Sequence, residues 1–163
     1  MSWLKGIAAL AAASAMAALA MGTPAALAGS PFEALAGTWS GKGTAKLEGG
    51  KSERLSCKGY YKGSGSSELR LNILCANPST KVELRSVLKY ANGRVTGTWE
   101  ERHFNQTGTI TGSATDSKLR LKIGGGALSG VLSVSIGEEK QSVSLSTDGS
   151  ALRGVNITFA RTS

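Results

Sequence analysis

The chain has 163 residues, of which 40% are hydrophobic and 18% are charged, and its formal net charge is +8. This length suits one domain with a hydrophobic core and leaves little room for a second domain. The basic balance bears on solubility and on anionic partners, and it carries no information about the fold.

Residues 1–28 have the order of a Sec-type secretory signal peptide. Lys5 precedes an apolar run rich in Ala and Leu, and Ala26-Leu27-Ala28 supplies a small-residue cleavage site. A retained transmembrane anchor is the alternative, but Gly-Thr-Pro at positions 22–24 ends the apolar run short of the roughly 20 residues that a span needs. We therefore predict a periplasmic or secreted protein whose mature domain covers residues 29–163.

The mature part begins with a short helical turn and continues as strands. Residues 29–36 predict the turn, with Ser30 as its cap and Pro31 at the first helical position. The hydrophobic period then changes to two, which is typical of β-strands, and turn-forming residues separate the segments. The predicted strands are 38–47, 52–61, 68–75, 81–90, 94–104, 107–115, 118–123, 127–136, 140–147 and 151–161.

The gaps between these strands are too short for a crossover helix, so consecutive strands should pair antiparallel as a meander. Closure into a barrel is the simplest way to leave no unpaired edge. The sequence therefore predicts an all-β protein, a single antiparallel meander β-barrel of about eight to ten strands.

One face of each predicted strand is apolar, because residues two apart share a face. Glycine recurs on this face, as at Gly41, Gly43, Gly97 and Gly112. Such glycines curve a sheet or leave volume for a ligand, and the sequence leaves both interpretations open.

Cys57 and Cys75 both fall on the apolar face, on the second and third strands. A turn centred on Ser66 would place them directly opposite each other, which is compatible with a cross-strand disulfide. An even cysteine count in an exported chain favours the bridge, and two buried thiols are the alternative.

Basic residues gather on the outer face of the first three strands. Turns centred on Gly50 and Ser66 would place like charges directly opposite in three pairs: Lys42 with Lys58, Lys46 with Arg54, and Lys62 with Arg70. Like charges in this position destabilise a sheet. We therefore consider this face a binding surface for an anionic lipid, an acidic polysaccharide or an acidic protein, with solubility alone as the alternative. Nucleic acid is not expected, because few aromatic residues lie on this face.

No catalytic arrangement is evident. The adjacent Glu100 and Glu101 point to opposite faces of a strand, and the triple glycine at 124–126 lacks the strand-to-helix context of a phosphate loop. The only histidine, His103, lies beside a turn, so we expect an exposed loop residue; a haem ligand is the alternative. We expect a non-enzyme with no cofactor, and no metal site because the cysteines should be oxidised.

The stretch Gly37-Thr38-Trp39 on the first strand, with Arg161 on the last, resembles the lipocalin and wider calycin superfamily. The chain also resembles small exported barrel proteins of alphaproteobacteria, and avidin-like and nitrobindin-like haem barrels begin with similar Gly-x-Trp strands. The resemblance implies that Trp39 closes the bottom of the barrel and that Arg161 packs across its ring. A solvated terminal charge is the alternative for Arg161. The apparent ten strands exceed the eight of typical lipocalins.

Together these features predict a monomeric barrel that binds a small apolar or amphipathic ligand in its interior. The residues expected to line or close that interior are Trp39, Tyr61, Trp99 and Arg161. The alternative is a filled barrel, an envelope binding module or inhibitor, that acts through its outer basic face on an anionic polymer, a lipid or a protein.

Overall fold

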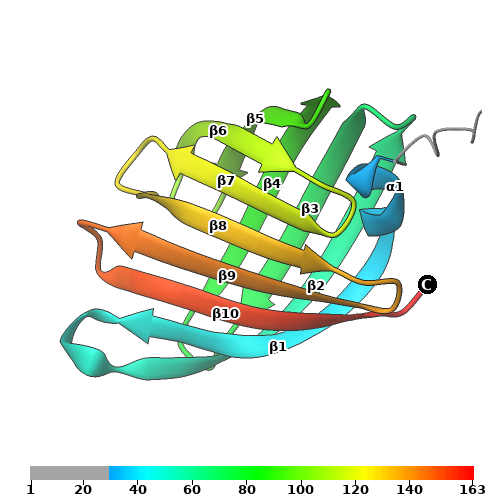
Figure 1. The fold of residues 1–163 in the computed structure, drawn as a ribbon. Coiled ribbons are helices and arrows are strands. Elements are labelled where there is room, and N and C mark those ends of the chain that lie inside the picture. The colour runs from blue at the N-terminus through cyan, green and yellow to red at the C-terminus, as the bar shows by residue number, and fades with distance from the viewer. Residues whose placement is uncertain (1–29) are drawn as a thin grey trace, which may run out of the picture.

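The computed structural model describes residues 30–163, and the predicted signal peptide lies outside these residues. Ten antiparallel strands close into one barrel, in which each strand pairs with its neighbours in sequence and the first strand pairs with the last (Figure 1). The elements are α1 (Pro31–Leu35), β1 (Gly37–Leu47), η1 (Glu48–Gly50), β2 (Ser52–Ser64), β3 (Glu68–Ala76), β4 (Lys81–Ala91), β5 (Arg94–Glu101), β6 (Gln106–Ala114), β7 (Lys118–Gly124), β8 (Ser129–Ile136), β9 (Lys140–Asp148) and β10 (Leu152–Arg161). The predicted all-β meander barrel is confirmed.

All ten predicted strands are present, and three of them have clearly different ends, with β2 continuing to Ser64 rather than ending at residue 61. β5 stops at Glu101 rather than at residue 104, because the Glu101 carboxylate accepts hydrogen bonds from the backbone N–H groups of His103 and Phe104 and so turns the chain. β8 begins at Ser129 rather than at residue 127. Among the described residues, none of the helices has the length and apolar character that a membrane span requires.

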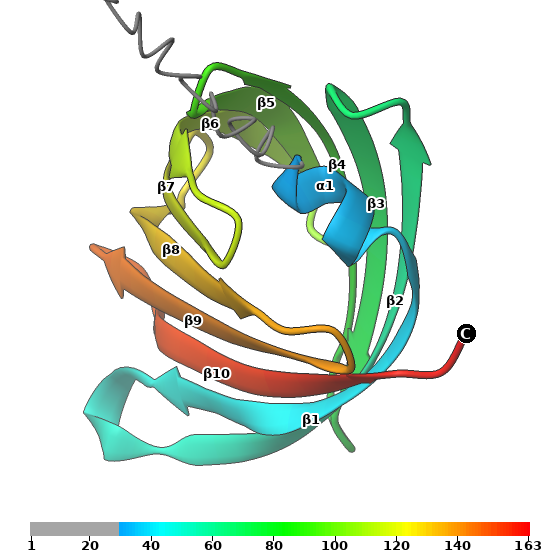
Figure 2. The ribbon, with the colours of Figure 1, turned by 45° about the vertical axis from the view of Figure 1, so that its right-hand side comes forward.

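α1 lies across one mouth of the barrel, as Figure 2 shows. The Ser30 hydroxyl caps the helix by accepting a hydrogen bond of 3.2 Å from the backbone N–H of Phe32, and Pro31 occupies the first turn. Phe32 and Leu35 are buried, and the Phe32 ring lies 5.8 Å from that of Tyr90 on β4. The predicted helical turn is therefore a plug for this end of the barrel.

The β1–β2 register differs from the predicted one by two residues. Gly49 and Gly50 both have positive φ, 76° and 78°, and the turn is centred one residue earlier than expected. Because the shift is even, every side chain keeps its predicted face. The lysines of β1 lie opposite serines, Lys42 opposite Ser56 and Lys46 opposite Ser52.

Two of the three predicted like-charge pairs are therefore wrong. Lys58 lies opposite Ser40, and Arg54 lies opposite Thr44. The third pair is confirmed, with Lys62 opposite Arg70 across β2 and β3.

The cysteine prediction is also confirmed. Cys57 and Cys75 are direct partners across β2 and β3 and form a disulfide that spans 18 residues of sequence. The bridge lies on the inner wall, where Cys57 is buried and Cys75 is partly exposed.

Inward-facing glycines let neighbouring strands approach closely. A Cβ atom at Gly43 would lie 2.0 Å from the carbonyl oxygen of Asn156 on β10, and one at Gly97 would lie 2.3 Å from that of Val87 on β4. Both distances are far below van der Waals contact, so these glycines serve the curvature of the sheet rather than volume for a ligand.

Candidate functional site in the barrel interior

The end of the barrel that α1 covers is filled with side chains. Trp39 is 0% exposed, and its indole Nε1 donates a hydrogen bond of 2.9 Å to the carbonyl of Leu35 in α1. Aromatic and aliphatic residues from the helix and several strands surround it: Phe32, Leu35, Tyr61, Leu69 and Phe159. This end is a packed hydrophobic core.

Arg161 fastens the plug. Its guanidinium carbon lies 4.2 Å from the centroid of the Trp39 ring, so the stacking implied by the calycin resemblance is confirmed. The same guanidinium donates hydrogen bonds to three main-chain carbonyls, those of Ala34 at 2.5 Å, Ala36 at 2.8 Å and Glu138 at 2.9 Å. One side chain thus ties together the end of β10, the α1 region and the β8–β9 turn.

Trp99, near the β5–β6 turn, is also buried, but several aliphatic inward-facing side chains farther from α1 are partly exposed. We call this set the aliphatic wall: Leu55, Ile73, Leu84, Leu132, Val143 and Val155. All six are partly exposed although parity places them on the same inner face as the packed core. The half of the barrel opposite α1 therefore presents accessible apolar surface on its inside.

A polar side chain lies where the packed core meets the aliphatic wall. Gln141 on β9 is only 2% exposed, pairs with Phe159 of β10, and lies one inward position from Val143. Among residues 30–163 its amide Nε2 has no hydrogen-bond partner. Burial raises the pKa of the Tyr61 hydroxyl well above its ordinary value, and the side chain of Gln141 partly offsets this rise. Gln141 thus places a buried amide beside the Tyr61 hydroxyl, and its Nε2 makes no hydrogen bond of full geometry among residues 30–163.

Sequence reasoning did not single out Gln141, although a signal was present. It has the same parity as Val143 and Leu145 on β9, where Thr147 is the other inward polar residue. A polar residue at such a position is either satisfied by a neighbour or available to a ligand.

The structure brings together three of the four residues predicted to line or close the interior. Trp39 and Tyr61 are both buried at the α1 end, with ring centroids 6.3 Å apart, and Arg161 covers Trp39. Trp99 is buried on β5, where its Nε1 donates a hydrogen bond of 3.2 Å to the carbonyl of Gly124 at the end of β7.

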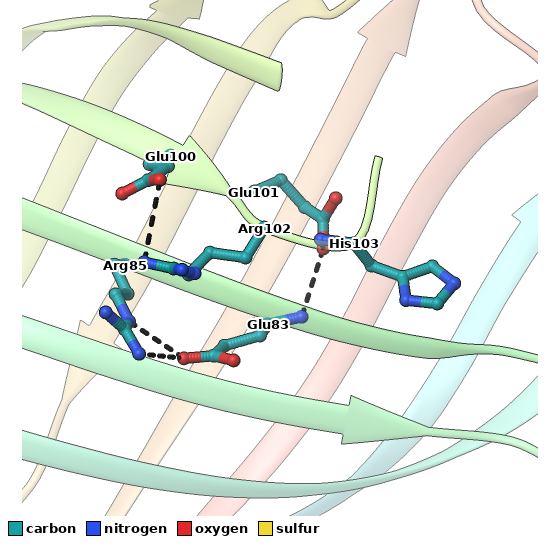
Figure 3. A network of polar contacts seen from close by, with 6 residues as sticks. All are labelled: Glu83, Arg85, Glu100, Glu101, Arg102 and His103. Atoms are coloured by element: carbon teal, nitrogen blue, oxygen red, sulfur yellow. Dashed lines mark hydrogen bonds and ion pairs between the residues drawn. The ribbon is translucent and has the colours of Figure 1, made fainter. Parts of the chain in front are cut away.

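Glu101 and its neighbours form a polar network at the β5–β6 turn (Figure 3). The buried Glu101 carboxylate accepts hydrogen bonds from three backbone N–H groups, those of Glu83, His103 and Phe104. On the outer surface Arg85 pairs with Glu83 at 2.7 Å and Arg102 lies 3.8 Å from Glu100. The two adjacent glutamates thus point to opposite faces as predicted, and Glu101 shapes the turn.

The remaining predicted residues lie on the outside of the barrel. His103 is exposed, as expected, and its ring meets that of Phe104 edge to face at 5.0 Å. Within the described residues no group of three or more His, Cys, Asp and Glu side chains is placed to hold a metal ion. The six basic residues of β1 to β3 are all exposed: Lys42, Lys46, Arg54, Lys58, Lys62 and Arg70.

Comparison with known proteins supports the architecture. No protein-family model matches the chain, and no curated protein matches it significantly. The crystal structure of Rv2717c from M. tuberculosis is similar with a TM-score of 0.68 and 17% identity, covering 80% of this chain and 94% of that one. The S-type phycobiliprotein lyase CPES from Guillardia theta is similar with a TM-score of 0.56 and 12% identity, covering 81% of this chain and 90% of the lyase. At these identities the likeness shows the fold alone, an antiparallel barrel consistent with the calycin-like architecture predicted from the sequence.

Proposed function

We propose that the protein is exported and binds a small amphipathic ligand, without catalysis, in the half of its barrel that faces away from α1. The observation that carries this proposal is the partly exposed aliphatic wall, which continues the inner face of a packed core. Apolar surface left in water is unfavourable by about 25 cal/mol per Å², so a ligand that covers the wall gains that free energy. This contrast favours a ligand-binding barrel over a filled one.

Gln141 supports a ligand with a polar end. A buried donor without a partner costs roughly 1 to 3 kcal/mol, and a carbonyl, carboxylate or ether oxygen on the ligand would remove that cost. Binding pockets of this kind are mainly apolar with few polar groups that fix orientation. We therefore expect an apolar body against the aliphatic wall and an oxygen acceptor directed toward Gln141.

Export has separate support. The Cys57–Cys75 disulfide is consistent with an oxidising compartment, where such bonds persist. This agrees with the signal peptide predicted from the sequence.

Native mass spectrometry of the protein purified from its native host tests the proposal directly. We expect a mass above that of the mature polypeptide, with the excess released as a small molecule on unfolding. A protein that carries no excess mass and also fails to bind an environment-sensitive fatty-acid probe would contradict the proposal.

A matched pair of variants on β8 locates the site. Leu132→Trp fills the interior, whereas Val131→Trp places the same ring on the outer face one residue away. We expect the inner variant to weaken probe binding by about tenfold or more and the outer variant to leave it unchanged. Equal binding by both variants would place the probe elsewhere.

Gln141→Leu separates the polar contact from the apolar one. It should weaken binding of a fatty acid by about fivefold, the equivalent of one hydrogen bond, and leave binding of a hydrocarbon of equal length unchanged.

A further inference from the structure

We propose that a basic groove on the outside of the barrel docks the protein onto an anionic lipid bilayer. The groove has a volume of about 690 Å³ and runs over β1 to β4 as far as the β5–β6 turn. Its positive side chains are Lys42, Lys58, Lys81 and Arg102, and we call this surface the basic groove. The inference goes beyond the proposed function and does not require a bound ligand.

The basic groove has an excess of positive charge that the protein does not neutralise. Its one carboxylate, Glu83, is already paired with Arg85 at 2.7 Å. Every ion pair among residues 30–163 uses an arginine, so Lys42, Lys58 and Lys81 have no carboxylate partner there. Lysines gathered without counter-charges repel one another, and a surface of anionic headgroups would offset that repulsion.

Apolar side chains accompany these charges and favour lipid as the partner. Leu74 lies in the basic groove and is 39% exposed. Phe104 follows His103 at the end of the groove and is 56% exposed. Aromatic and aliphatic side chains beside lysines are typical of surfaces that enter the boundary between headgroups and acyl chains. A soluble polyanion would match the charges and leave Leu74 and Phe104 in water.

Phe104 is presented by a defined turn. Its backbone N–H donates a hydrogen bond of 2.5 Å to the buried carboxylate of Glu101, which also accepts from the N–H of His103 at 3.0 Å. Asn105, which follows, has a positive φ of 52° that completes the turn. A rigid apolar tip loses little conformational freedom when it enters a bilayer.

The basic groove lies toward the half of the barrel opposite α1, which contains the aliphatic wall. In a meander, alternate turns lie at the same end, so the β1–β2, β3–β4 and β5–β6 turns all lie at the end opposite α1. Docking through the basic groove and Phe104 therefore directs the end opposite α1 toward the bilayer. This end is the one nearer the aliphatic wall. An amphipathic molecule leaving the bilayer would meet this wall first.

A second groove on the neighbouring outer face makes a useful contrast. It also measures about 690 Å³ and includes Lys62, Arg70 and Arg85; both arginines are paired with glutamates, Arg70 with Glu68 at 3.0 Å, whereas Lys62 is in no ion pair within residues 30–163. Among the described residues, the second groove thus has one lysine in no ion pair, against three in the basic groove.

Vesicle flotation with the mature chain tests the inference. We expect binding to phosphatidylcholine vesicles that contain phosphatidylglycerol, loss of that binding in high salt, and none to phosphatidylcholine alone. Replacing the three lysines together (Lys42→Gln, Lys58→Gln and Lys81→Gln) should lower vesicle affinity about a hundredfold, at about fivefold per charge. Phe104→Ser should lower it roughly tenfold with the charge unchanged.

The matched control removes the same charge from the α1 end, with Lys89→Gln, Lys118→Gln and Lys140→Gln, all exposed in the structure. It should keep vesicle affinity within about threefold of the parent, because charges far from the contact are screened. Circular dichroism confirms that each variant is folded.

Three results would overturn the inference. One is failure of the parent protein to bind anionic vesicles, and another is an equal loss in the control variant. The third is an unchanged affinity in Phe104→Ser together with competition by a soluble acidic polysaccharide, which would identify a polymer as the partner. Probe binding in the interior is measured separately, so failure here leaves the proposed function intact.

Discussion

The two ends of the barrel have the same inward alternation of side chains and differ in what covers them. At one end α1 and Arg161 cover Trp39, which has no exposed surface. At the other end the inward aliphatic wall is partly exposed. The comparison indicates that the α1 end provides most of the stability and leaves the opposite half of the barrel available for binding.

The strongest test of this division compares one truncation at each end. Trp39→Ala removes a fully buried ring and should lower the free energy of unfolding by about 3 to 5 kcal/mol. Leu55→Ala, in the aliphatic wall, should lower it by about 1 kcal/mol because the side chain is already partly exposed. Urea unfolding followed by circular dichroism measures both values.

Equal losses at Trp39 and Leu55 would contradict the division. If Trp39→Ala does not fold, Trp39→Phe keeps the test measurable, since a smaller ring retains part of the packing.

A second test replaces one arginine at each end of the barrel by lysine. Arg161→Lys keeps the charge but cannot donate to several carbonyls at once, so we expect a loss of about 1 to 2 kcal/mol in the free energy of unfolding. At the end of the barrel opposite α1, the exposed Arg153 pairs with Glu48 at 3.0 Å. Arg153→Lys should change the free energy of unfolding by less than about 0.5 kcal/mol. Thermal and urea unfolding of the two variants give the comparison, and similar losses would mean that Arg161 does not fasten the plug.

The smallest expected effect is a pH dependence from Tyr61. Burial raises the pKa of its hydroxyl in the folded protein above the ordinary value of 10.0. As pH rises beyond that ordinary value, the unfolded chain ionises first, so this contribution to stability decreases with increasing pH. Between about pH 9 and about pH 11 the resulting loss should be about 1 kcal/mol.

Tyr61→Phe should remove this part of the pH dependence in urea unfolding. Tyr60→Phe, which alters the adjacent exposed tyrosine, should leave it unchanged. If both variants behave like the parent protein, burial of Tyr61 does not control the alkaline limit of stability.

Alternation in the sequence predicts the faces of the strands well, and it does not predict their register fully. A period of two assigns Trp39 and Cys57 to the interior whichever residue pairs are opposite. The position of the β1–β2 turn decides the pairs, and adjacent glycines with positive φ allow more than one position. For this reason the disulfide pair was predicted correctly, while Lys42 and Lys46 were assigned the wrong partners.

The candidate site depends more heavily on three-dimensional placement. Parity indicates that Gln141 points inward, but only the packed structure shows that its amide has no partner. The basic groove likewise combines lysines from β1, β2 and β4 with Arg102 from a turn. Such a surface depends on the register of three strand pairs, which periodicity alone does not determine.

Closure of the barrel has a consequence for self-association. Each of the ten described strands is hydrogen-bonded on both sides, and the contact between β1 and β10 is extended by backbone bonds from Thr38 to Ser163 at 3.0 Å and from Thr162 to Thr38 at 2.8 Å. An incoming chain therefore finds no unpaired strand in this part of the molecule on which to build intermolecular sheet. Fibril growth by strand addition would first have to separate β1 from β10, the seam that Arg161 helps to hold.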